Sequence, residues 1–74
     1  MNVLILKTMA NGQHERTITH FSTIELALIN LYGSMRACVG DSNCTLAVME
    51  IISDDGFVYK TDRFERQTVE GVKS

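Results

Sequence analysis

The stretch 21-FSTIELALINLYGSMRAC-38 decides the fold, because it carries the strongest local signals in the 74-residue chain. Ser22 with Glu25 three residues later has the pattern of a capping box, which predicts Ser22 as the N-cap of a helix. Phe21 and Leu26 flank that cap at the spacing of a hydrophobic staple. The helix is predicted from about residue 23 to about residue 38, with apolar residues of its core face at three- and four-residue spacing: Ile24, Leu28, Leu31, Met35 and Cys38.

Two segments before this helix predict a β-hairpin. Residues 2–9 are apolar on both faces of a strand, which is typical of a central strand. Asn11-Gly12 is a strong turn signal, because both residues tolerate a positive φ. Residues 14–20 are polar, rich in threonine and alternating, which favours an edge strand.

A second hairpin is predicted after the helix, which Gly40 and the polar residues 41–43 should end. Residues 44–53 form another strand that is apolar on both faces, and residues 54–56, Asp-Asp-Gly, have the composition of a tight turn. A fourth strand follows, with alternation that places Phe57 and Tyr59 on one face and Val58 and Lys60 on the other.

The order strand, strand, helix, strand, strand predicts an α+β fold. Short connections favour a four-stranded antiparallel sheet with the strand order 2-1-3-4 and the helix packed on one face. We expect residues 1–66 to form this single ββαββ domain and residues 67–74 to be a flexible tail.

The charge and hydropathy of the chain argue against a nucleic-acid partner and against a membrane span. The net charge is −2, and Lys60, Arg63 and Arg66 are interleaved with acidic residues, so nucleic acid is not expected as a partner. No apolar run is long enough for a signal peptide or a membrane span, so we expect a cytoplasmic protein, in the host cell if a phage encodes it.

Cys38 and Cys44 are the only cysteines, and four interpretations of them are open: buried thiols, a disulfide, a metal site or a reactive thiol. Two cysteines supply half of the ligands that zinc needs. The C-terminal end of a helix, where Cys38 is predicted, disfavours a thiolate. Reduced buried thiols are therefore the favoured interpretation.

The remaining chemical candidates do not predict an enzyme. His14 and His20 share one face of an edge strand without an evident partner, and Asp54 and Asp55 are better explained as turn residues than as a carboxylate pair. We therefore expect no catalytic residue, no metal site and no cofactor.

The expected sheet has more apolar surface than one helix covers. The strands at 2–9 and 44–53 are apolar on both faces, while a helix of about 16 residues packs on one face only. A second subunit is the expected cover, so the sequence predicts a homo-oligomer, a dimer or higher.

The segments FSTIELALINLY and ISDDGFVYKTDRF, within residues 18–64, resemble a loose group of small proteins from phages and prophages of Gram-positive bacteria. This resemblance implies a phage setting and carries no specific activity. Small phage proteins of this kind often act by binding, which implies a non-enzymatic inhibitor of a bacterial defence system that binds a host protein or sequesters a nucleotide signal. A structural or accessory protein of phage assembly, without a small-molecule ligand, is the alternative.

A candidate binding surface follows from residue types that anchor interfaces. We expect a host protein there, or an anionic nucleotide if Lys60, Arg63 and Arg66 converge with Arg36 across a subunit interface. The predicted surface consists of Tyr32, Arg36, Asp41, Asn43, Tyr59, Lys60, Arg63 and Phe64.

Overall fold

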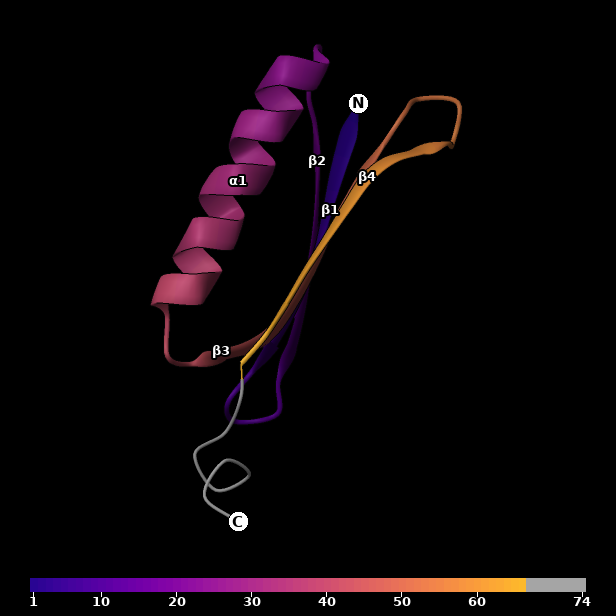
Figure 1. Ribbon diagram of the computed structural model, residues 1–74. Helices are drawn as coiled ribbons and strands as arrows, with labels where there is room; N and C mark the ends of the chain where they lie inside the picture. The colour runs from indigo at the N-terminus through magenta and orange to yellow at the C-terminus, as the bar shows by residue number, and fades with distance from the viewer. Residues whose placement is uncertain (67–74) are drawn as a thin grey trace.

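Four strands and one helix follow one another in the predicted order in the computed structural model, which describes residues 1–66 (Figure 1). The elements are β1 (Asn2–Met9), β2 (His14–His20), α1 (Ile24–Gly40), β3 (Cys44–Ile52) and β4 (Val58–Glu65). All neighbouring strands are antiparallel in the sheet order β2-β1-β3-β4, and α1 lies against one face. The predicted α+β class and strand order are therefore confirmed, while the expected flexible tail, residues 67–74, lies outside the described residues.

Both hairpins use the same turn geometry. In the first, the Met9 N–H donates to Gln13 O at 2.8 Å and the Gly12 N–H donates to Met9 O at 2.9 Å. The second repeats this pattern between residues 53 and 57. Gly12 and Gly56 occupy the third loop position with φ of 88° and 95°, a conformation that a Cβ disfavours. The predicted turns at Asn-Gly and Asp-Asp-Gly are thus confirmed.

The N-terminus of α1 differs from the prediction by one residue. Thr23, not Ser22, is the N-cap: its backbone is extended, and its hydroxyl accepts the Leu26 N–H at 3.3 Å. Because the cap is shifted, Glu25 occupies the second helical position, where it complements the helix dipole but cannot complete a capping box. Leu26 remains half exposed, while Phe21 packs against the core.

The core lies between α1 and the two central strands. From α1 it receives Ala27, Leu31 and Cys38 as fully buried residues, with partly buried Ile24, Leu28 and Met35 beside them. The predicted core face is confirmed, and Ala27 is an addition to it. The sheet contributes these buried residues: Val3, Ile5, Cys44, Ala47, Met49 and Ile51.

A β-bulge changes which side chains of β4 share a face. Ile51 pairs with Lys60, but the next residue, Ile52, pairs with Val58, so Tyr59 has no partner across the ladder. Val58 therefore lies on the face opposite Lys60, and the predicted shared face of these two residues is wrong. Simple alternation fails here because a bulge inserts one unpaired residue into the strand.

Candidate binding surfaces

The β4 residues of the predicted surface lie on two opposite faces of the sheet. Lys60 and Phe64 lie on the face that carries α1, and Phe64 packs against the core there. Arg63 pairs with Val48 on the other face. Successive strand residues alternate between faces, so these three side chains do not form one surface.

The other predicted residues are separated along the length of the sheet. Asp41 and Asn43 lie in the loop between α1 and β3, where the Asp41 carboxylate accepts the Asn43 N–H at 3.0 Å. The Asn43 carbonyl accepts the Ala10 N–H of the first hairpin loop at 2.6 Å. Tyr59 lies at the opposite end, near the turn between β3 and β4. The eight residues therefore do not make one continuous surface.

Part of the predicted set does come together, where the flank of α1 meets β4. The Lys60 Nζ lies 5.6 Å from the centre of the Tyr32 ring, within the range of a cation–π interaction. Arg36 lies one turn further along the exposed side of α1, and Ile29, one turn before Tyr32, is 68% exposed. Asp62 lies on the same face of β4 as Lys60, one strand period later. Tyr32, Lys60 and Asp62 lie where α1 meets β4, and Ile29 and Arg36 continue this surface over the outer side of α1. We call these five residues the α1–β4 surface.

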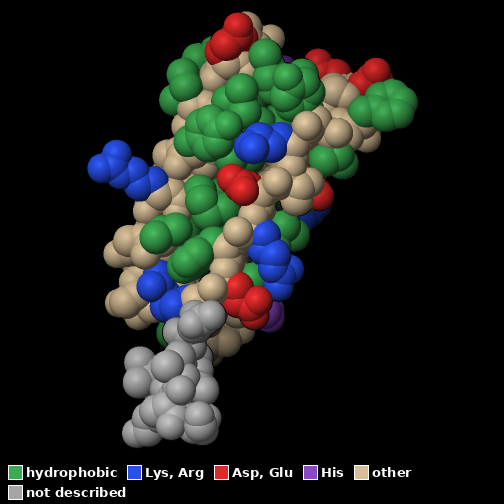
Figure 2. All heavy atoms as spheres, viewed as in Figure 1, with side chains coloured by type: hydrophobic (Ala, Val, Ile, Leu, Met, Phe, Trp, Pro, Cys, Tyr) green, Lys and Arg blue, Asp and Glu red, His purple; other side chains and the backbone are tan. Residues whose placement is uncertain are grey.

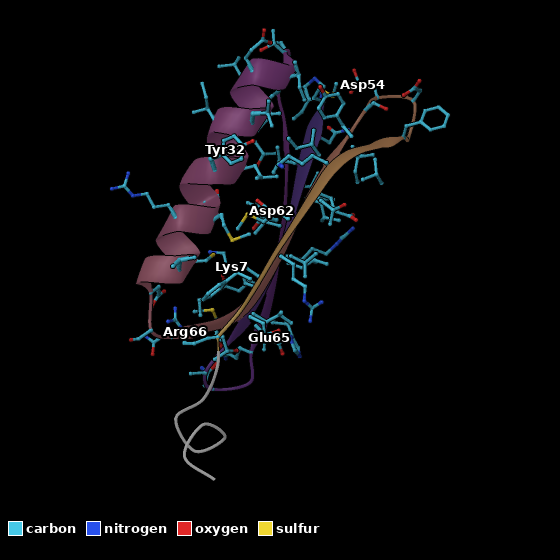
Figure 3. The ribbon with its side chains drawn as sticks, viewed as in Figure 1. Lys7, Tyr32, Asp54, Asp62, Glu65 and Arg66 are labelled. Carbon is cyan, nitrogen blue, oxygen red and sulfur yellow. The ribbon has the colours of Figure 1, made fainter. Side chains whose placement is uncertain are left out.

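The α1–β4 surface exists because one helix is narrower than four strands. α1 packs mainly on β3 and to a lesser extent on β1, so the helix-facing residues of β4 extend past its edge. Figure 3 shows Tyr32 on the flank of α1 near β4, with Asp62 of β4 beside the helix. Figure 2, in the same view, shows hydrophobic side chains gathered over this part of the molecule, with basic and acidic groups among them.

The second face of the sheet carries no helix in the described part of the chain, and we call it the open face. Its residues form four cross-strand rows, each read from β2 to β4: His20–Asn2–Ile52–Val58, Ile18–Leu4–Glu50–Thr61, Arg16–Leu6–Val48–Arg63 and His14–Thr8–Leu46–Glu65. Ile18 and Val58 are each 55% exposed, and Leu6 is 40% exposed. Apolar side chains thus run across the open face between charged ones.

A hollow of about 420 Å³ opens on the open face. Leu6, Leu46 and Val48 supply its apolar lining, and Arg16 and His14 stand at the β2 side. The rest of the lining comes from Lys7, Thr8 and Glu15. The hollow can receive apolar side chains from a partner surface.

Arg66, which the sequence places in a run of mixed charge, follows the last residue of β4 and closes the C-terminal end of α1. Its guanidinium donates to the carbonyl oxygens of Cys38, Val39, Asp41 and Cys44 at 2.9–3.2 Å. It also lies 5.0 Å from the Phe64 ring centre. The last turn of α1 has no basic residue of its own, so Arg66, distant in sequence, supplies the cation that this end of the helix favours (Figure 3). The sequence shows only that the last turn of α1 lacks a basic residue; it does not show that Arg66 would supply the missing charge.

Cys38 and Cys44 are free thiols and are buried in the core at the two ends of the α1–β3 connection. The Cys44 Sγ donates to Leu46 O at 3.6 Å. Burial, followed by the hydrogen bond with Cys44, raises the pKa of the Cys38 thiol to about 11. A protonated, buried thiol is a poor nucleophile, so this geometry favours the structural interpretation.

The histidines and the turn aspartates are occupied by local contacts. His14 Nδ1 lies 3.0 Å from Thr8 Oγ1, and His20 Nδ1 lies 3.0 Å from Asn2 Oδ1. Asp54 accepts a hydrogen bond from the Met1 amino group at 3.0 Å, and this bond lowers the pKa of its carboxyl. The partner of Asp55 is the Ser53 hydroxyl within the turn.

Within residues 1–66, no three histidine, cysteine or acidic side chains are grouped closely enough to hold a metal ion. No helix in that range combines the length and apolarity needed to cross a membrane. Comparisons with protein-family models, curated proteins and solved structures found no match to the chain.

Proposed function

We propose that the chain is a small non-enzymatic binding protein of phage type that inhibits a bacterial defence system by occupying a surface of a host protein. The observation that carries this proposal is the α1–β4 surface. It presents an exposed tyrosine, an exposed arginine and an exposed isoleucine as neighbours on successive turns of α1. Tyrosine and arginine are the residue types that most often anchor protein interfaces.

The physical chemistry of this surface supports a protein partner. Tyr32 offers a large ring that loses little conformational entropy on binding, and Lys60 already restrains one side of it at 5.6 Å. Lys60 and Asp62 place both signs of charge near the apolar groups, an arrangement that favours a specific partner over a general anion. The surface is built on a helix and a strand, so it is preorganised.

A nucleotide ligand has weaker support than a host protein. The predicted phosphate site needed Lys60, Arg63 and Arg66 near Arg36. Arg66 is instead hydrogen-bonded to four carbonyls, and Arg63 lies on the open face beside Glu65. Within one chain, these basic groups do not converge on a single phosphate.

The proposal is tested by expressing the protein in bacteria that carry single defence systems and challenging them with phage. We expect one system to lose protection, and its purified target to bind the protein directly. Tyr32→Ala should weaken that binding at least tenfold, which corresponds to about 1.4 kcal/mol, while Thr61→Ala on the open face should not change it. Undiminished protection by every system, together with co-sedimentation of the protein with phage particles, would reject inhibition in favour of an assembly role.

A further inference from the structure

We propose that the open face is the interface of a face-to-face homodimer, in which Arg16 of each copy pairs with Glu50 of the other. This inference concerns a different surface from the α1–β4 surface. It rests on the composition of the open face, on two charged groups without an ion partner, and on their position in the sheet.

The open face has the apolar content and the size of a small dimer interface. Its apolar residues are Leu4, Leu6, Ile18, Leu46, Val48, Ile52 and Val58. Four strands about 4.8 Å apart and about eight residues long present roughly 500 Å² per copy. Two such faces bury about 1,000 Å², near the lower limit of a specific interface, so a dimer must use most of the face.

The charges of the open face are self-complementary. It carries two arginines and two glutamates, and Arg63 and Glu65 already pair at 3.4 Å on β4. Arg16 and Glu50 have no ion pair within 4.0 Å among residues 1–66. Glu50 is the more consequential of the two, because it is half-buried between apolar neighbours on a central strand.

The sheet register places these two charges where a two-fold axis can pair them. Leu6 of β1 is the row neighbour of Arg16, and Leu4 of β1 is the row neighbour of Glu50. The midpoint between the two charges therefore falls on β1, between the two leucines. A two-fold axis that lies in the plane between the two sheets, passes over that point and is perpendicular to the line joining the two charges brings each Arg16 to the second copy's Glu50. It also brings the leucines of the two copies together.

Because the dimer is symmetric, one complementary pair of residues contributes two contacts to the interface. In a two-fold interface every contact occurs twice, so one Arg16–Glu50 contact becomes two. The same packing sets the hollow beside Arg16 against apolar side chains of the second copy. It also leaves both α1–β4 surfaces on the outside of the dimer, because α1 lies on the opposite face of the sheet.

The test is sedimentation equilibrium of the full chain. We expect the native protein at twice the 8.3 kDa chain mass. Glu50→Arg should weaken dimerisation at least about tenfold, since two pairs become like-charge contacts, and the double variant Arg16→Glu with Glu50→Arg should restore it to within a few-fold. Arg36→Glu, which changes a charge on the outer side of α1, is the matched control and should leave the mass unchanged.

A second variant keeps the proposal testable if Glu50→Arg does not fold. Ile18→Lys changes a half-exposed residue on edge strand β2, and we expect a folded monomer, with unchanged far-UV circular dichroism. If the native protein is a monomer at a chain concentration on the order of 100 µM, the proposal is overturned, because its dissociation constant is then too high for a specific dimer. A dimer that dissociates with Arg36→Glu but not with Ile18→Lys would also overturn it.

Discussion

Arg66, the residue after β4, should contribute more to stability than any exposed or half-exposed charge of that strand. Its guanidinium donates to four carbonyl oxygens, three of them from the end of α1 and the loop that follows. The Nε and Nη2 atoms together have three N–H groups for these four carbonyls, so at roughly 0.5 kcal/mol for each N–H group of a partly exposed side chain they supply about 1.5 kcal/mol. A cation at a helix C-terminus adds about 0.3–1 kcal/mol. Arg66→Ala should therefore lower the free energy of unfolding by about 2 kcal/mol.

The matched control for this change is Arg63→Ala. Arg63 lies three residues earlier, in β4, but its side chain is 60% exposed on the open face and makes one ion pair, with Glu65, at 3.4 Å. An exposed pair of this kind contributes less than about 1 kcal/mol. Arg66→Lys should fall between the two, because an ammonium keeps the charge but cannot reach all four carbonyls from one planar group.

Urea denaturation followed by circular dichroism measures both changes. With a slope of about 1 kcal/mol per molar urea for a chain of this size, Arg66→Ala should move the midpoint by about 2 M. All variants are compared at the same chain concentration, since dimerisation would make the midpoint depend on it. If Arg66→Ala moves the midpoint no further than Arg63→Ala, the account of Arg66 as the cap of α1 is refuted.

Four further predictions concern the helix and the thiols. Thr23→Ala should cost about 1 kcal/mol of stability and Ser22→Ala almost nothing in thermal denaturation, because only Thr23 accepts a backbone N–H; equal effects would contradict the observed cap. Asn30→Leu should stabilise the fold by about 1 kcal/mol, because the Asn30 Oδ1 is buried without a hydrogen-bond partner among the described residues. A loss of stability in the same thermal denaturation assay would show that this oxygen has a partner. Cys38 should resist alkylation at pH 8 in the folded protein, since a pKa of about 11 leaves about one thiol in a thousand ionised, and it should label fully in denaturant. The same raised pKa of Cys38 predicts how the free energy of unfolding depends on pH. Below pH 9 the thiol is protonated in both the folded and the unfolded chain, so stability is full; above pH 9 the unfolded chain ionises first, and stability falls by up to about 1.4 kcal/mol per pH unit. Urea midpoints that stay constant from pH 8 to pH 10 would exclude this linkage.

The sequence predicted those features of the fold that depend on neighbouring residues. The bounds of β1 and β2 agree with it because apolar patterning and the Asn11-Gly12 turn act over a few residues. The open face was also predictable, since β1 and β3 are apolar on both sides and one helix covers one side. The capping error was small because Ser22 and Thr23 are both good caps, and only the backbone conformation distinguishes them.

The candidate binding surface was less predictable than the fold. Tyr32 and Lys60 belong to the predicted surface and lie within cation–π distance of each other. Asp62 and Ile29 join that surface only through the width of the sheet and the position of α1. The bulge at Tyr59 placed Val58 on the face opposite Lys60, against expectation, because one unpaired residue interrupts the alternation of the strand. No local signal in residues 57–62 marks that insertion.

The sequence by itself thus determined the elements, their order and the sheet face that no helix covers within residues 1–66, because propensity, periodicity and turn chemistry are local properties. Only the tertiary structure decided which charged groups meet. Arg66 reaches the end of α1 across 25 to 28 residues of chain, while Arg16 and Glu50 share a face without meeting. Such pairings depend on register and packing distance, and in a sheet a shift of one residue moves a charge to the opposite face.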